Sequence, residues 1–134
     1  MVNSISLQGF TGFTNNSFSF TNGINILIGK NGTGKTHILK CLASALQAHH
    51  EFQQKRTTSK EQFEYILAEN ITHYFKPDFI GNLVNKNIVP GKSTVSIKND
   101  GKELSFSFSA TSRTTVKIEK DEKWDECQFI YIPP

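Results

Sequence analysis

Apolar and polar residues alternate along the first part of the chain with the period of a β-strand. Residues 2–7 and 17–20 alternate in this way on either side of the turn-rich residues 9–16, and Asn22-Gly23 precedes another alternating run at residues 24–28. A period of two fits a strand with one buried face, and Asn-Gly favours a tight hairpin turn. The pattern predicts an N-terminal β-meander whose last strand ends at residue 28.

Two later segments have the three-to-four-residue spacing of apolar positions that indicates an amphipathic helix. The first runs over about residues 34–49. The second follows a polar loop at residues 53–59, where Ser59 is placed as the N-cap with Gln62 in the capping-box position, and it ends at Pro77. The apolar stripes are Ile38, Leu39, Leu42, Ala45 and Leu46 in the first helix and Phe63, Ile66, Leu67, Ile71 and Tyr74 in the second.

In the last third of the chain, apolar residues again occupy every second position, as in a β-strand. Residues 94–98 and 104–108 flank the turn Asn99-Asp100-Gly101, and residues 115–119 alternate in the same way. Residues 129–132 are more continuously apolar, as in a parallel strand that is buried on both faces. These elements predict one α/β domain, in which a mixed sheet with an antiparallel β subdomain packs with two to three helices. Its three parts are residues 1–50 (β-meander, glycine-rich loop and first helix), 51–92 (helical segment) and 93–134 (hairpins and final strand).

A glycine-rich loop joins residues 24–28 to the first helix, and it carries candidate chemistry. It fits the phosphate-loop (Walker A) pattern G-x-x-x-x-G-K-[ST] with Gly29, Lys30, Asn31, Gly32, Thr33, Gly34, Lys35 and Thr36. Glycines let backbone N–H groups approach an anion, and the following helix presents its positive end. Lys35 supplies a charge for the β- and γ-phosphates, and the Thr36 hydroxyl is a hard oxygen ligand for Mg²⁺. The loop predicts a nucleoside triphosphate site, and the absence of an N-K-x-D guanine-reading motif favours ATP.

Charge and cysteine content refine this interpretation. The chain has 134 residues and a net charge of +3, and residues 1–50 contain three lysines and no Asp or Glu, which raises the local potential for a polyanion. A chance lack of acidic residues is the alternative. Cys41 lies on the apolar helix stripe and Cys127 stands alone, so neither has zinc spacing and both fit a reduced, cytoplasmic protein. No apolar run is long enough to cross a membrane, so the sequence predicts a soluble protein without a membrane partner.

Several other residues allow two interpretations. His37 follows Thr36 and is either a phosphate contact or, the favoured alternative, a helix residue on a polar face. His49 and His50 are either a metal pair or a solvated helix end, and the second is favoured because adjacent helical side chains do not face each other. Trp124 is either a partner-binding tip or, more commonly for such a residue, half-packed on the sheet. The eleven phenylalanines fit a core better than a base-stacking platform.

Two segments together resemble the start of an ABC-type ATPase head. They are Ile5-Ser6-Leu7-Gln8-Gly9-Phe10-Thr11-Gly12-Phe13 and Asn22-Gly23-Ile24-Asn25-Ile26-Leu27-Ile28-Gly29-Lys30-Asn31-Gly32-Thr33-Gly34-Lys35-Thr36. They are similar to the phrases "lkNFrgF" and "iNvliGkNGsGKT" of the branch that contains SMC proteins, RecF, OLD-family nucleases and prokaryotic AAA family ATPases. Residues 93–132 resemble the antiparallel lobe of such heads, and residues 130–134 the strand before the Q-loop. The resemblance implies ATP and Mg²⁺ as ligands, and a role in DNA maintenance or phage defence, with nucleic acid as a partner only in the full system.

The second half of such a catalytic site is missing from this sequence. The family's arginine beside Phe10 is absent. A Walker B strand needs apolar residues before Asp-Glu, whereas Lys123-Trp124 precede Asp125-Glu126, and Glu69 lies on a helical pattern. Neither a Ser-Gly-Gly-type signature nor a Q-loop glutamine is found. No catalytic residue is assigned, and we expect Mg–ATP binding with little or no hydrolysis by this chain alone, because binding substrate and transition state alike does not raise the chemical rate.

Three functions fit these observations. The favoured one is the N-terminal lobe of an ABC-type ATPase head, as a fragment or a truncated product, which needs the remaining half of the head or a second subunit. The alternative is a complete, small regulatory or interaction protein on a phosphate-loop scaffold. A small phosphate-loop kinase is the third, and it is disfavoured because such kinases continue with further βα units whereas this chain continues with hairpins.

Overall fold

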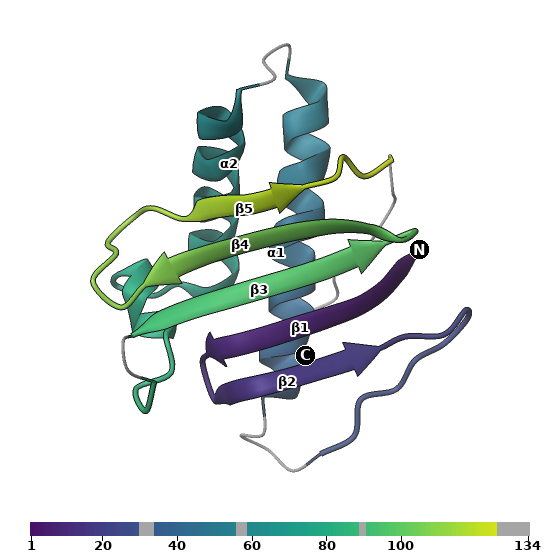
Figure 1. The fold of residues 1–134 in the computed structure, drawn as a ribbon, viewed down its shortest axis with the longest axis horizontal. Coiled ribbons are helices and arrows are strands. Elements are labelled where there is room, and N and C mark those ends of the chain that lie inside the picture. The colour runs from purple at the N-terminus through teal and green to yellow at the C-terminus, as the bar shows by residue number, and fades with distance from the viewer. Residues whose placement is uncertain (30–33, 56–58, 89–90, 126–134) are drawn as a thin grey trace.

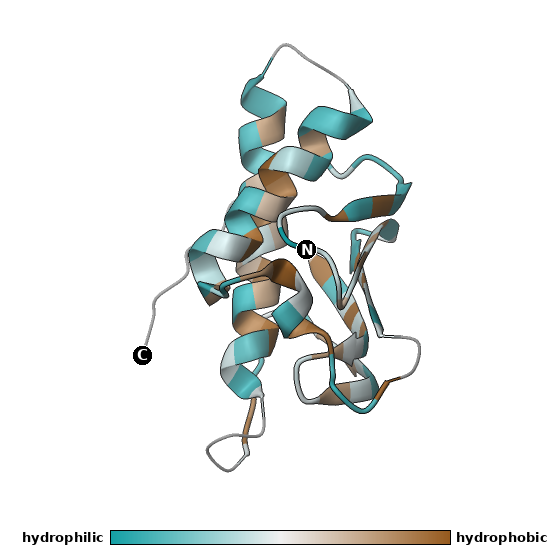
Figure 2. Cartoon of the chain, turned by 90° about the vertical axis from the view of Figure 1, so that its left-hand side faces the viewer, coloured by the Kyte–Doolittle hydropathy of each residue, from teal (hydrophilic) through white to brown (hydrophobic). Residues whose placement is uncertain are grey.

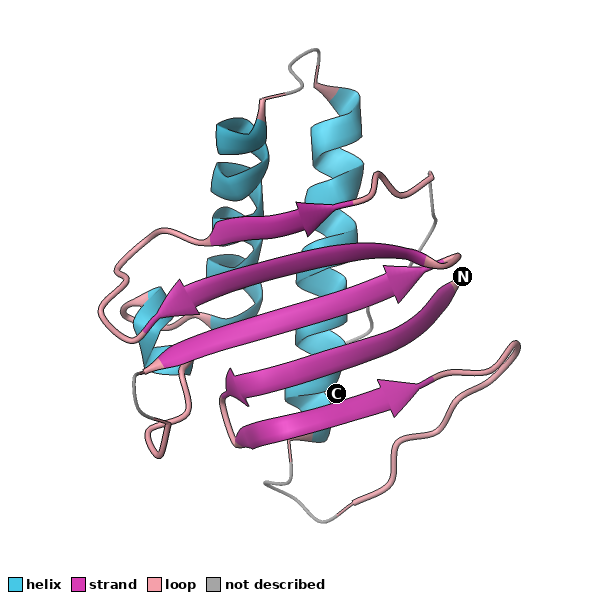
Figure 3. Ribbon diagram, in the orientation of Figure 1, coloured by secondary structure: helices cyan, strands magenta, loops and turns pink. Residues whose placement is uncertain are grey.

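The computed structural model describes residues 1–29, 34–55, 59–88 and 91–125, which form an antiparallel sheet with two helices on one of its faces (Figure 1). Five strands lie in the order β2-β1-β3-β4-β5. The elements are β1 (Val2–Phe10), β2 (Phe13–Ser19), α1 (Lys35–Gln54), α2 (Lys60–Phe75), the 3-10 helix η1 (Ile80–Leu83), β3 (Lys92–Asn99), β4 (Lys102–Ser109) and β5 (Lys117–Asp121). Figure 3 shows the same view by element type. The predicted α/β class, with an antiparallel β subdomain and two to three helices, is confirmed, whereas the sheet that was predicted as mixed is antiparallel throughout the described residues.

The two faces of the sheet differ in chemistry because side chains alternate along each strand. Ile5 of β1 is opposite Ile97 of β3, and Ile97 is opposite Leu104 of β4; these side chains are buried under the helices. The other face carries small polar side chains, and the Ser6 and Ser17 hydroxyls lie 3.0 Å apart across β1 and β2. The apolar face fixes the register, since a shift by one residue would expose it.

The two helices form a single layer that covers this apolar face (Figure 2). The Ser59 Oγ accepts a hydrogen bond from the Gln62 N–H at 3.2 Å, so the predicted N-cap of α2 is confirmed. Phe52 of α1 stacks on Phe63 of α2 with ring centroids 4.7 Å apart. In the part of the chain that the structure describes, no helix combines the length and apolar character needed to cross a membrane.

Residues 24–28 differ from the prediction, because they form no strand. Ile24, Ile26 and Ile28 are 90%, 76% and 91% exposed, whereas Leu27 packs against the core. A strand requires a neighbour for its backbone hydrogen bonds, and the sheet of described residues ends at β2. The segment instead begins with a turn that Asn25 closes, since its Oδ1 accepts from the Thr21 N–H at 2.9 Å and its Nδ2 donates to the Thr21 carbonyl at 2.8 Å.

Two other elements have bounds that differ from the prediction, and one predicted strand is not described. The first helix was predicted to end at residue 49, but α1 continues to Gln54, and the predicted strand 115–119 is β5, two residues later. The predicted parallel strand at residues 129–132 lies outside the described residues.

Candidate nucleotide-binding site

The described end of the predicted phosphate loop lies at the N-terminus of α1. Gly34 is the N-cap residue, with a φ of 93° that side-chain-bearing residues rarely adopt. It has no side chain to accept from the first helical N–H groups, and the first turn of α1 contains no acidic residue. The positive end of the helix is therefore open to an anion.

The side chain of Lys35 links the two described ends of the loop. Its Nζ donates a hydrogen bond to the carbonyl oxygen of Gly29, the first residue of the motif. Thr36 follows in the first turn and is exposed. The motif residues between these ends, Lys30, Asn31, Gly32 and Thr33, lie outside the described residues. The structure therefore places Gly29, Gly34, Lys35 and Thr36 together around one loop.

The ring of Phe13, which the sequence allows as a base-stacking residue or a core residue, lies against Gly34. A Cβ built on Gly34 would be 2.7 Å from Cζ and 2.9 Å from Cε2 of Phe13, closer than such atoms approach in proteins. Phe13 begins β2 and is only 7% exposed. Gly34 is therefore required for two reasons, its positive φ and this close contact. Only the position of Phe13 directly after the Gly9–Gly12 turn could have indicated this contact in advance.

His37 packs under the start of α1. Its ring centroid is 5.7 Å from that of Phe75, the last residue of α2, and its Nδ1 is buried without a hydrogen-bond partner among the described residues. Burial lowers the pKa of His37, and the nearby Lys40 ammonium lowers it further. The expectation of a polar helix face is thus wrong, since the ring is half-buried against Phe75. A phosphate contact by His37 stays a prediction.

His49 and Trp124 form a second buried contact, at the far end of α1. The expected solvated helix end is wrong for His49, which is 7% exposed with its ring 5.5 Å from that of Trp124. The reason is that α1 continues past His49 and the chain after β5 packs beside it. Trp124 is 4% exposed and its Nε1 donates to the Lys102 carbonyl at 2.7 Å, so it is a packed residue and not a partner-binding tip. Across the described residues, no three His, Cys, Asp or Glu side chains gather as a metal site.

The remaining cysteine and aromatic predictions concern the core. Cys41 is buried, as predicted from its place on the helix stripe, and burial raises the pKa of its thiol to about 12. Phe10 packs edge-on against Phe75 and Phe108 at 5.4 and 6.2 Å. Most described phenylalanines are likewise buried or half-buried, which confirms their core role; Phe79, at the surface, is an exception.

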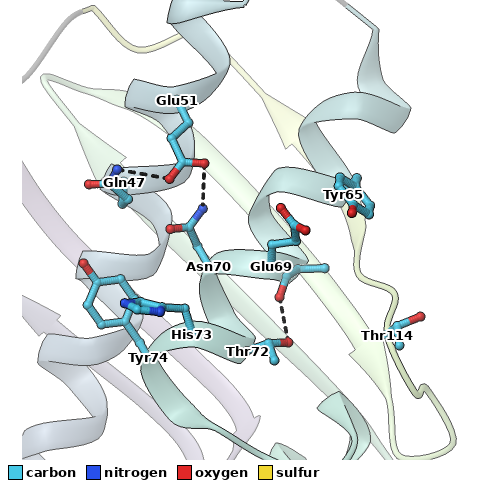
Figure 4. A pocket seen from close by; sticks show the side chains of 10 residues that line it. Gln47, Glu51, Tyr65, Glu69, Asn70, Thr72, His73, Tyr74 and Thr114 are labelled. Atoms are coloured by element: carbon cyan, nitrogen blue, oxygen red, sulfur yellow. Dashed lines mark hydrogen bonds between the residues drawn. The ribbon is translucent and has the colours of Figure 1, made fainter.

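A groove of about 730 Å³ lies on the helices, and sequence reasoning did not find it (Figure 4). Gln47 and Glu51 of α1 and Asn70 of α2 hydrogen-bond to one another there, with Glu51 accepting from Gln47 at 3.1 Å and from Asn70 at 3.4 Å. Glu69 lines the same groove and lies in α2, as its helical pattern predicted. These three side chains link α1 to α2 through hydrogen bonds.

Comparison with known proteins identifies the family. The family model described as AAA domain matches residues 4–130. The chain belongs to the AAA domain family. This AAA domain is also 33% identical over 81 residues to the DNA replication and repair proteins RecF of Francisella tularensis subsp. novicida (strain U112) and subsp. holarctica (strain LVS). That match covers 59% of this chain and 22% of each RecF protein, so it spans about a fifth of their length.

The fold of the AAA domain is similar to that of a solved SMC ATPase, from work on ATP-driven dimerization and DNA stimulated activation of these enzymes. The TM-score is 0.55 at 13% identity, over 92% of this chain and 72% of the other. The family match, the partial similarity to RecF and the SMC ATPase-like fold agree with the resemblance noted in the sequence.

The position of Asp125 is consistent with the expectation that Asp125-Glu126 is not a Walker B pair. It follows the end of β5 and its Oδ1 lies 3.6 Å from the Lys102 Nζ, in an exposed ion pair. Glu126 lies outside the described residues.

Proposed function

We propose that this AAA domain binds Mg–ATP through residues 29–36, as the N-terminal lobe of an SMC/RecF-like ATPase. The observation that carries the proposal is the Walker A motif ending at a glycine N-cap of α1, with the Lys35 amine folded back onto Gly29. Backbone N–H groups and a helix N-terminus are the groups that proteins use to bind phosphates.

Each described residue of the loop has a distinct role in this proposal. Lys35 exchanges its contact with the Gly29 carbonyl for the β- and γ-phosphates, as a mobile charge can. The exposed Thr36 hydroxyl would hold a Mg²⁺ ion, which prefers oxygen ligands. Gly34 leaves the first N–H groups of α1 uncovered. When bound, Mg²⁺ would offset charge on the phosphates.

Hydrolysis requires more groups than the described residues supply. Phosphoryl transfer needs several positioned charges around the γ-phosphate, and the loop alone gives ground-state binding. We therefore expect little or no turnover by this chain alone. The exposed Ile24, Ile26 and Ile28 support a need for a further part of the head, since a row of apolar side chains beside a nucleotide loop is normally covered.

The partners of the complete ATPase are proposed from its relatives. The similarity to RecF and to an SMC ATPase favours DNA and self-association as partners of the complete system, in DNA maintenance or phage defence. Two unclustered cysteines favour the cytoplasm as its location.

Calorimetric titration of the full chain with Mg–ATP tests the proposal. Lys35→Ala should weaken binding at least tenfold, whereas Lys40→Ala, which removes an equal charge one turn further along α1, should change it less than threefold. If the unchanged chain and Lys35→Ala bind Mg–ATP with equal affinity, the assignment of the site to residues 29–36 is wrong. Phosphate release by the unchanged chain that Lys35→Ala abolishes would contradict the expected lack of turnover.

A further inference from the structure

The turn between β1 and β2 lies against the last glycine of the phosphate loop. Its residue Phe13 is buried, and the ring is so close to Gly34 that a single added carbon at Gly34 would meet it at 2.7 Å. Gly34 in turn begins α1, because its carbonyl accepts the helical hydrogen bond from the Ile38 N–H at 3.1 Å. The ring thus contacts the residue at which loop becomes helix.

The backbone of this turn is held by the end of η1 and the residues after it. The Thr11 N–H donates to the Leu83 carbonyl at 2.6 Å, and the Asn85 N–H donates to the Gly9 carbonyl at 2.7 Å. Phe10, between them, pairs with Val84 in an isolated β-bridge. Leu83, the last residue of η1, and the two residues that follow it therefore fix the turn, and a fixed turn sets the position of the ring that follows it.

The Phe13 ring itself has little freedom. It packs edge-on against Phe18, across a distance of 5.9 Å between ring centroids, within the same strand β2. Gly34 has no side chain with which to anchor itself, and glycine is the residue with the greatest backbone freedom. The contact with Phe13 is therefore what limits the movement of Gly34 on that side.

We propose that Phe13 is a positioning residue for the phosphate loop. Its ring holds Gly34 in place, so that Lys35 and the open N-terminus of α1 are arranged for a polyphosphate before the ligand arrives. A preformed site binds more tightly because less ordering remains to be done on binding. The inference rests on the proposed function, since it assigns a role toward that same site.

Matched variants of the full chain separate positioning from general stability. Phe13→Leu and Phe108→Leu remove the same atoms from equally buried positions, but Phe108 lies in β4 and contacts Phe10 instead of Gly34. Each is titrated with Mg–ATP and with inorganic tripolyphosphate. We expect affinity for both ligands to fall about fivefold or more in Phe13→Leu and less than twofold in Phe108→Leu, with similar losses of thermal stability. Equal affinities in the two variants would overturn the proposal.

Amide hydrogen exchange of the Ile38 N–H without ligand gives a second readout. Exchange in Phe13→Leu should be faster than in Phe108→Leu, because a loosened Gly34 carbonyl releases this hydrogen bond more often. Equal exchange in both variants would overturn the positioning role. If the unchanged chain binds neither ligand, the proposed function fails, and the exchange result still decides whether Phe13 holds Gly34.

Discussion

The Glu64 carboxylate of α2 accepts a hydrogen bond from the Ile118 N–H of β5 at 2.7 Å. In the sheet that the described residues form, β5 is an edge strand, so a helix side chain satisfies a backbone donor that a neighbouring strand would otherwise satisfy. Charged residues along β5, among them Lys117 and Glu119, make this edge unattractive to another strand. The contact joins the helix layer to the sheet at its outer strand.

Removing the Glu64 carboxylate should destabilise the domain. We expect Glu64→Ala to lower the free energy of unfolding by about 1 to 3 kcal/mol, the usual cost of losing a hydrogen bond to a charged group. Glu64→Gln should lose less, because an amide oxygen still accepts. Urea unfolding measures both. Glu61→Ala, which removes an exposed carboxylate from the same helix, is the control and should cost under about 1 kcal/mol; an equal loss there would contradict the role of the Ile118 contact.

Gly9 should tolerate no side chain, although it lies within β1. Its φ is +64° and an added Cβ would be 2.5 Å from the Lys92 carbonyl oxygen. Gly9→Ala should therefore lower the free energy of unfolding by about 1 to 3 kcal/mol. In Gly12→Ala the added carbon meets nothing within 4 Å, so thermal unfolding should show a change under about 1 kcal/mol. The prediction is wrong if Gly9→Ala and Gly12→Ala unfold at the same temperature.

Protonation of His49 should weaken the fold. Burial against Trp124 lowers the pKa of His49, an effect that the backbone of Asp125 and the carboxylate of Asp121 oppose. A histidine with a lowered pKa in the folded state stabilises above its unfolded pKa of about 6.5, and that contribution is lost as the pH falls below this value. Stability should thus decrease from pH 7 to pH 5, and the decrease should be smaller in His49→Phe.

Urea unfolding at several pH values checks this expectation. His73→Phe removes an exposed imidazole from α2 and is the matched control. If His49→Phe and His73→Phe keep the same pH dependence as the unchanged chain, His49 is not its source.

The exposed isoleucines should govern association and not folding. Ile26→Ser should leave the free energy of unfolding within about 0.5 kcal/mol, since the side chain is mostly in solvent, and should reduce self-association in sedimentation velocity. Leu27→Ser, one residue later, should lower stability by about 1 to 2 kcal/mol because Leu27 packs on the core. If Ile26→Ser sediments like the unchanged chain, the exposed isoleucines do not mediate self-association.

The sequence predicted the elements whose signals are local. The Asp100-Gly101 turn has the left-handed φ angles of 51° and 79° that its residues favour, and Ser59 caps α2 as its position indicated. The family and fold also followed from the motif and its flanks. These features depend on a few neighbouring residues, so reading the chain in order is enough to find them.

What the sequence did not predict depends on residues that are distant along the chain. Residues 24–28 have a strand pattern but lie beside no strand of the described sheet. An alternating pattern indicates that a segment favours the extended conformation, but it does not identify the strand with which the segment would pair. His49 and Trp124, far apart in sequence, bury each other. The contact of Phe13 with Gly34 is of the same kind. The roles of the loop residues themselves stay predictions, because half of the motif lies outside the described residues.

The position of β1 between β2 and β3 has a consequence for the order of folding during synthesis. β2 follows β1 after a turn of two residues, whereas β3, in which Ile97 is opposite Ile5, is synthesised about 80 residues after β1 ends. Pairings between such distant segments form slowly, and apolar surface stays open until they do. The ribosome therefore releases α1 well before β3, β4 and β5, so a chaperone that covers Ile5 and Leu7 in that interval would raise the yield of folded domain.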